Sequence, residues 1–339
     1  MSLFHSMARR LDLLPPGRAA LLGGVVGVVA VLAMRQLDWP GGVVVVGPVL
    51  ILAILLGFSA EPLAVELEVE EEDPNRPPKN PKPGQEWTNP VDGSVLVYVP
   101  GGEYRLGSEN VYQGVEIPRG LEDNAKEWES WARPMHRVHL SGFWIGRDPI
   151  TNEQYRRFLA DNSEADEPKF WDDSRFNEER QPVVGVSWDE AKAYCGWAGL
   201  ALPTESQWEA AARGQDERRY PWGNEEPGSE LACFGQDFTT GQPAEVGSFP
   251  RGNGPFGTRD QAGNVWEWCE DPWDESAYAH RDGESDPLAE GDPTIRVVRG
   301  GSWRDWASYL RSANRNRNGV QYRDVSLGFR CVGSVPSEP

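Results

Sequence analysis

The segment Gly263-Asn-Val-Trp-Glu-Trp268 decides the fold of this chain, together with Val298-Arg-Gly-Gly-Ser-Trp303. Both lie beyond Gly214, where Gly, Pro, Asn and Trp dominate and hydrophobic residues show hardly any regular periodicity. A long irregular stretch needs a metal, a disulfide or dense aromatic packing to fix it. The chain holds 15 Trp in 339 residues, so we expect most indoles to lie in a packed core or on a recognition surface.

More regular structure is expected before Gly214. Ser94 to Tyr98 and Phe143 to Ile145 have the composition of strands bounded by Gly and Pro. Three capping boxes predict helix starts, because in each a Ser/Thr hydroxyl and a Glu/Gln side chain satisfy each other's backbone N–H groups. They are Thr151-Asn-Glu-Gln154, Ser187-Trp-Asp-Glu190 and Thr204-Glu-Ser-Gln207.

Charge excludes one class of function. With 53 acidic and 33 basic residues the chain carries −20, which argues against nucleic-acid binding because phosphates are neutralised by Lys and Arg. Residues 1–60 differ from the rest, since four Arg and two Asp give this segment +2 and leave −22 for the remainder.

Two apolar runs, 19–34 and 41–60, are each long enough to cross or nearly cross a lipid bilayer as a helix. We therefore expect a basic N-terminal segment at 1–18 and a transmembrane helical hairpin at 19–60. A signal peptide covering the first run is the alternative, and it leaves the second run as an anchor. For the hairpin, the arginines of residues 1–18 lie on the same side as the large domain, so the positive-inside rule places that domain in the cytoplasm.

Residues 61–86 form an acidic, Pro-rich linker with six prolines and the run Glu70-Glu-Glu-Asp73. Such composition is typical of an extended spacer, and a binding tail for a basic partner is the alternative. The remaining 87–333 are enough for one sizeable domain, followed by a tail at 334–339.

Eight segments of this domain resemble, in order, the motifs of the formylglycine-generating enzyme (sulfatase-modifying factor) family. They are Val99-Pro-Gly-Gly-Glu-Tyr-Arg-Leu-Gly-Ser108, Pro149-Ile-Thr-Asn152, Val186-Ser-Trp-Asp-Glu-Ala191, Leu202-Pro-Thr-Glu205, Tyr220-Pro-Trp-Gly-Asn224, Gly263–Trp268, Val298–Trp303 and Leu327-Gly-Phe-Arg-Cys331. The resemblance implies an α+β, C-type-lectin-like fold with little regular secondary structure. It does not cover the hairpin or the linker.

The family's catalysts oxidise a substrate cysteine to formylglycine with copper held by two thiolates, ligands that suit copper(I). The resemblance places these thiolates at Asp305 and Leu310, neither of which is a copper ligand of that kind. The family's Ser and Trp are retained as Ser302 and Trp266, but Ser302 has no activating base in the sequence. Formylglycine synthesis and a copper cofactor are therefore not expected.

The resemblance also implies one structural calcium site at Asp260, Gly263, Val265 and Glu267, with two side-chain and two carbonyl oxygens, the ligand type that Ca²⁺ prefers. The alternative is that Glu267 pairs with a nearby arginine.

The four cysteines include Cys195 and Cys331, which match a family disulfide, and Cys233 and Cys269 are a possible second pair. Disulfides would place the domain in an oxidising, exterior or periplasmic compartment, against the charge argument. Buried free thiols in the cytoplasm are the alternative.

The segment from Ser302 to Arg323 is rich in Arg and aromatic residues, as binding hot spots are, and it lines the substrate groove in the family. The binding residues expected there are Trp303, Arg304, Trp306, Tyr309, Arg311, Arg315, Arg317 and Arg323. Alternatively, some of these arginines make structural ion pairs.

Three interpretations of function follow. The preferred one is a membrane-anchored, calcium-stabilised domain that has lost the copper chemistry and acts as a binding or assembly module for a protein or peptide partner. The second is a family enzyme with different chemistry at Ser302 and Asp305. The third is a diversified ligand receptor.

Overall fold

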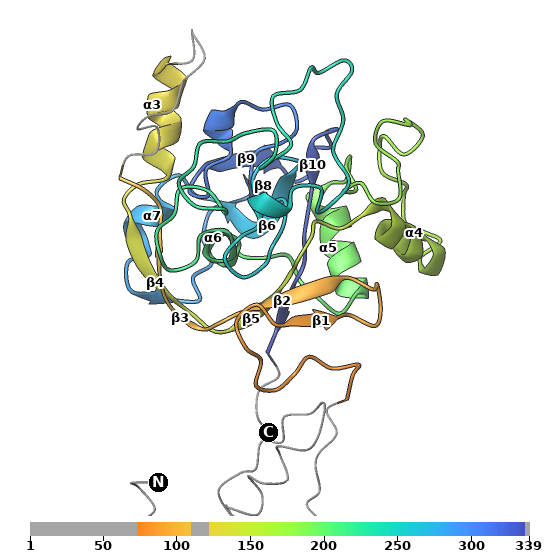
Figure 1. Ribbon diagram of the computed structural model, residues 1–339, viewed down its shortest axis with the longest axis horizontal. Coiled ribbons are helices and arrows are strands. Elements are labelled where there is room, and N and C mark those ends of the chain that lie inside the picture. Colours follow the sequence, from red (N-terminus) through yellow and green to blue (C-terminus); the bar gives the residue numbers. More distant parts are fainter. Residues whose placement is uncertain (1–72, 110–121, 336–339) are drawn as a thin grey trace, which may run out of the picture. The chain divides into compact units, whose positions relative to one another are not determined.

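The computed structural model describes residues 73–109 and 122–335 (Figure 1). The predicted transmembrane hairpin, the basic segment before it and residues 61–72 of the linker lie outside these residues. Within the described part, no helix is both long and apolar enough to cross a membrane.

A four-stranded antiparallel sheet carries the two predicted strands at its centre. Its order is β1 (Glu86–Thr88), β2 (Val95–Val99), β5 (Phe143–Gly146) and β11 (Val332–Ser334). Strand β5 is buried along its whole length, and Val97 pairs with Ile145 at its centre. The last strand therefore returns to the start of the domain and closes the fold.

All three predicted helix starts are confirmed, each with a complete capping box. The helices are α4 (Asn152–Asp161), α5 (Trp188–Trp197) and α6 (Glu205–Arg213). Helix α6 is buried on nearly every side, including its charged residues Glu205, Glu209 and Arg213. Buried charges require partners, so this helix sets the electrostatics of the interior.

The chain beyond Gly214 contains one four-stranded sheet, which the sequence does not predict. Its order is β10 (Leu327–Gly328), β6 (Trp266–Trp273), β8 (Asp292–Arg299) and β9 (Arg315–Gly319). Strand β6 is buried on both faces at its start and shifts register between Trp268 and Pro272. Its sequence therefore lacks the alternation of hydrophobic and polar residues that identifies a strand with one solvent-exposed face.

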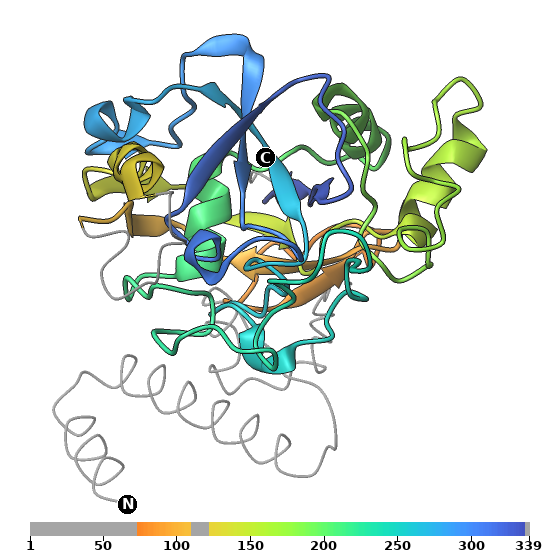
Figure 2. The ribbon, with the colours of Figure 1, turned by 90° about the horizontal axis from the view of Figure 1, so that it is seen from above.

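The other elements are short. A three-stranded sheet joins β3 (Gly102–Leu106), β4 (His136–Leu140) and β7 (Glu284–Ser285). Helices α3 (Glu122–Trp131) and α7 (Ala277–His280) and the 3₁₀ turns η1 (Pro250–Gly252) and η2 (Ala307–Tyr309) complete the described part. Helices α3 and α4 lie on opposite sides of the domain in both views (Figures 1 and 2).

Most tryptophans pack in the core, as expected. Trp144 on β5, Trp208 on α6, Trp268 on β6 and Trp303 after β8 have no exposed surface. Aromatic packing therefore fixes much of this fold.

The end of the linker belongs to the domain. Gly84 N donates to Tyr98 O at 2.9 Å, and Trp87 Nε1 donates to Pro74 O at 3.3 Å. A side chain at position 84 would approach Phe256 O to 3.3 Å, and Gly84 has φ +72°. Gly84 and Gln85 are thus bonded to strand β2, while residues 73–86 keep exposed or half-buried side chains.

Candidate functional site

The glycines of the Val298–Trp303 segment turn the chain so that Ser302 and Asp305 meet. Gly301 has φ +73°, and a Cβ there would lie 3.2 Å from Tyr309 O. Asp305 Oδ2 then accepts hydrogen bonds from the Ser302 hydroxyl and, at 2.8 Å, from Trp266 Nε1. Burial raises the pKa of the Asp305 carboxyl, while the bonds from Ser302 and Trp266 and the charge of Arg304 oppose the shift.

Asp305 and Leu310, the residues at the two thiolate positions, have different surroundings. Leu310 is fully buried and packs with Tyr220, Ala232 and Ala262, so its side chain is part of the core. Ser302 also has no exposed surface and donates its hydroxyl to Asp305. The sequence places no base next to Ser302, yet the structure brings the Asp305 carboxylate to its hydroxyl.

Two expected groove residues are core residues instead. Trp303 packs with Phe176, Val184 and Val265, and Arg315 is fully buried against Glu205. The expectation that they line an exposed groove is wrong, because Arg and Trp also serve as interior partners of buried carboxylates and aromatic rings.

The other groove arginines divide between surface and interior. Arg323 pairs with Glu190 at 2.7 Å, and Arg317 lies over the rings of Trp131 and Trp273 at 4.5 and 4.8 Å. Arg311 is buried but lines a cavity. Arg315 and Arg323 thus make ion pairs of the kind that the alternative of structural arginines expects.

The partner of Arg315 belongs to a buried charge network that the sequence does not reveal. Its members are Glu205, Glu209, Asp271, Tyr278, Arg213, Arg281, Arg299 and Arg315. Glu205 accepts bonds from Arg299 at 2.7 Å and from Arg315 at 2.6 and 2.9 Å. Although burial alone would raise it, the pKa of Glu205 is lowered to about 2 by these arginines.

Exposed aromatic rings lie near Arg304 in space or in the sequence. We use the name aromatic face for Phe238, Arg304 and Tyr322, which are linked through Asp324 and a ring contact, together with Trp306, two residues after Arg304 in the chain; the rings of Phe238, Trp306 and Tyr322 are 60%, 58% and 47% exposed. The Arg304 guanidinium lies 5.2 Å from the Phe238 ring centroid and pairs at 2.8 Å with Asp324, which also accepts a bond from Tyr322. Phe238 is absent from the predicted residues because it lies in a separate loop, joined to this segment by bonds such as Gly235 N to Asp305 O.

The candidate calcium residues lie together, but Glu267 has another partner. Both of its oxygens accept from Arg330, at 2.6 and 2.7 Å, and Trp208 Nε1 adds a third bond. Asp260 accepts from Gly247 N, and burial raises its pKa to about 7, with Glu267 among the neighbouring charges that raise it further.

Glu267 thus makes the arginine pair that is the alternative to calcium, and a cation beside Asp260 would have to share Glu267 with Arg330. No group of three or more His, Cys, Asp or Glu side chains suited to a metal occurs in the described ranges, so carbonyl oxygens are essential to this set.

The four thiols are all buried. Cys195 Sγ and Cys331 Sγ lie 3.0 Å apart as two free thiols, so the structure brings the expected pair together without a bond between them. Cys233 packs near Trp303, whereas Cys269 packs with Trp208 in a different part of the core, so the structure does not bring this second pair together.

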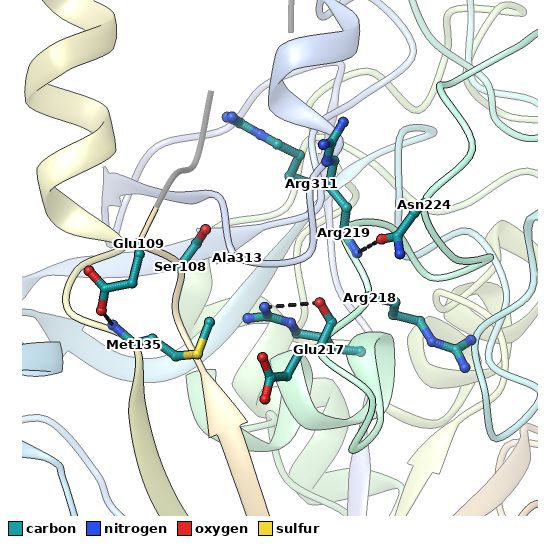
Figure 3. Close-up of a pocket in the computed structure, with 10 residues that line it drawn as sticks. Ser108, Glu109, Met135, Glu217, Arg218, Arg219, Asn224, Arg311 and Ala313 are labelled. Atoms are coloured by element: carbon teal, nitrogen blue, oxygen red, sulfur yellow. Dashed lines mark hydrogen bonds between the residues drawn. The ribbon is translucent and has the colours of Figure 1, made fainter. Parts of the chain in front are cut away.

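A cavity of about 250 Å³ lies beside Arg311 (Figure 3). Arg218, Arg219 and Asn224 stand along one side of it, and Ser108, Glu109 and Met135 along the other. Arg311 is the only residue of this cavity among the expected groove residues, because the other walls come from separate segments.

Known proteins share this sequence pattern. The "Serine/threonine-protein kinase pkn1" of Chlamydia caviae is 33% identical over 71% of this chain and 38% of its own length. The "Hercynine oxygenase" of Mycolicibacterium smegmatis is 31% identical over 73% of this chain and 63% of its length, so the chain spans less than two thirds of these relatives. The "Formylglycine-generating enzyme" of Thermomonospora curvata is 31% identical over 70% of this chain and 92% of its length.

The fold has a match among solved structures as well. PvdO from Pseudomonas aeruginosa superposes with a TM-score of 0.60 at 23% identity, covering 75% of this chain and 99% of that one. A sequence profile described as "Sulfatase-modifying factor enzyme 1-like domain" matches residues 81–335. The chain therefore belongs to the formylglycine-generating enzyme (sulfatase-modifying factor) family.

Proposed function

We propose that the chain is a binding module of this family and not a copper-dependent formylglycine-generating oxidase. One observation carries the proposal: Asp305 and Leu310 occupy the two thiolate positions, and Leu310 is fully buried. A carboxylate and a core leucine do not supply the soft ligands that copper(I) favours. The hydroxyl of Ser302 is equally inaccessible, which disfavours an alternative reaction there.

The aromatic face supports a protein or peptide partner. Binding hot spots are enriched in Trp, Tyr and Arg, and apolar side chains that gather in one exposed patch mark interaction sites. Arg304 is held between Phe238 and Asp324 in the unbound chain. Binding therefore costs less side-chain conformational entropy at this residue.

The test of the oxidase question is direct. The purified full-length chain, supplied with copper and oxygen, is incubated with a Cys-containing sulfatase peptide, and the peptide mass is followed. A formylglycine-generating enzyme serves as positive control. The proposal expects an unchanged peptide, and oxygen-dependent conversion to the aldehyde would overturn it.

We also propose that Asp260, Glu267 and the carbonyl oxygens of Gly263 and Val265 hold a structural Ca²⁺. Bound ligand stabilises the folded state, by about 3 kcal/mol at a hundredfold excess over Kd. The melting temperature should therefore rise with Ca²⁺ over a chelator, and not in Asp260→Ala, while Asp282→Ala on the surface keeps the response. Equal melting with Ca²⁺ and chelator would contradict the site.

Residues 19–60 are proposed to anchor the chain in a lipid bilayer as two passes, with the domain in the cytoplasm by the charge rule. A Cys195–Cys331 bridge would instead favour the exterior. A cysteine at the exposed position of Ser229 reports the side: labelling by an impermeant thiol reagent only after permeabilisation supports the cytoplasm. Labelling of intact cells would reverse the orientation.

A further inference from the structure

The cavity of Figure 3 is rich in hydrogen-bond donors. Four guanidinium side chains line it: Arg213, Arg218, Arg219 and Arg311. Arg213 is already bonded to Glu209, and Arg218 is paired with both oxygens of Asp216, so Arg219 is the main candidate for a bond to a ligand. Each guanidinium has five N–H donors in a planar fork that matches a carboxylate or phosphate. Asn224 accepts from Arg219 N with its amide oxygen, so the nitrogen of this amide is a further donor.

The acidic residues of the cavity wall have protein partners. Glu109 accepts from Met135 N at 3.0 Å, and Glu217 pairs with Arg105 at 2.5 Å. Arg219 pairs with Glu226 through one nitrogen, Nη1, at 2.6 Å, while its side chain remains one-third exposed. The guanidinium can thus keep its ion pair and still donate to a ligand.

We propose that this cavity binds a carboxylate of the partner, an inference that rests on the proposed binding function. Guanidinium forks hold carboxylates through two parallel charge-assisted hydrogen bonds. The nearby Glu109 and Glu217 lower the local positive potential, which favours a singly charged carboxylate over a doubly charged phosphate. The carboxylate comes from an Asp or Glu side chain or from a chain terminus.

Two measurements on the full-length chain test this assignment. The first is the melting temperature with glutarate, with neutral glutaramide and with inorganic phosphate. The second is binding to an array of hexapeptides that carry Glu or Gln at each position and a free or amidated C-terminus. Both compare the wild type with Arg219→Gln and with Arg180→Gln, a matched exposed arginine that pairs with Glu245 at 3.2 Å.

The expected result is stabilisation by glutarate but not glutaramide, and about tenfold tighter binding of peptides that keep the carboxylate. Arg219→Gln should remove both effects and Arg180→Gln neither. Preference for Glu peptides identifies a side-chain source, and preference for free C-termini a terminal one; either supports the proposal.

Other outcomes overturn it. Stabilisation by phosphate equal to that by glutarate replaces the carboxylate assignment with a general oxyanion site. Peptide binding that ignores carboxylates, and yet is lost in Trp306→Ala, overturns the cavity proposal and leaves the binding function standing. Stabilisation by glutarate with no peptide bound overturns the peptide source and the proposed function together, while absence of both signals rejects the cavity.

Discussion

Arginine and aromatic side chains occur together in two regions of this domain, with opposite surroundings. In the buried network, Arg299 and Arg315 converge on Glu205 without any exposed surface. In the aromatic face, Arg304 lies between an exposed ring and one surface carboxylate. In the buried network the guanidinium groups bond other groups of the protein. In the aromatic face the exposed rings and Arg304 remain available to contact a partner.

The comparison teaches that residue type alone does not separate packing from recognition. Arg315 and Arg304 lie in the same segment, and arginine is a residue type that is enriched in binding hot spots. The difference is the partner, because Arg315 meets a carboxylate from α6 while Arg304 meets Asp324 near the surface.

The largest expected effect comes from breaking the interior network. Glu205→Gln leaves Arg281, Arg299 and Arg315 with too little negative charge in a dry environment, and we expect a loss of about 3 to 5 kcal/mol. Urea denaturation of the full-length chain measures it. Glu153→Gln removes an exposed pair with Arg157 and should cost less than about 0.5 kcal/mol. Similar urea midpoints for the two variants would show that the network does not contribute to the free energy of unfolding.

Low pH should also reduce the stability of the folded chain, through protonation of Glu205. The pKa of Glu205 is about 2 in the folded chain against 4.5 for an ordinary glutamate, so its stabilisation is present above pH 4.5 and is lost as the pH falls toward 2. The loss is about 3 kcal/mol. Urea midpoints between pH 5 and 2.5 should fall in the wild type and more gently in Glu205→Gln. Parallel curves would contradict the assigned shift.

The smallest stability effect is expected at the aromatic face. Trp306 and Tyr322 are about half exposed, so replacing both with Ala should change stability by no more than about 1 kcal/mol. Thermal unfolding measures it. A large loss would mean that these rings hold the fold together and would place them with the interior network.

Local signals in the sequence predict the start of each capped helix and the two central strands, because caps and bounded apolar runs act within a few residues. Strand β6 could not be predicted, since both of its faces are buried at its start and no alternation remains. Asp305 and Leu310 are found by motif spacing, whereas Phe238 and the partner of Arg315 depend on contacts between distant segments.

Binding by the aromatic face tests the central claim most directly. The full-length chain and its Trp306→Ala/Tyr322→Ala variant are compared on the peptide array, with Val91→Ala/Leu288→Ala as control because these residues are similarly exposed apolar side chains elsewhere. The account predicts that binding falls about tenfold or more in the first variant and stays unchanged in the control. Equal binding by all three proteins would contradict it.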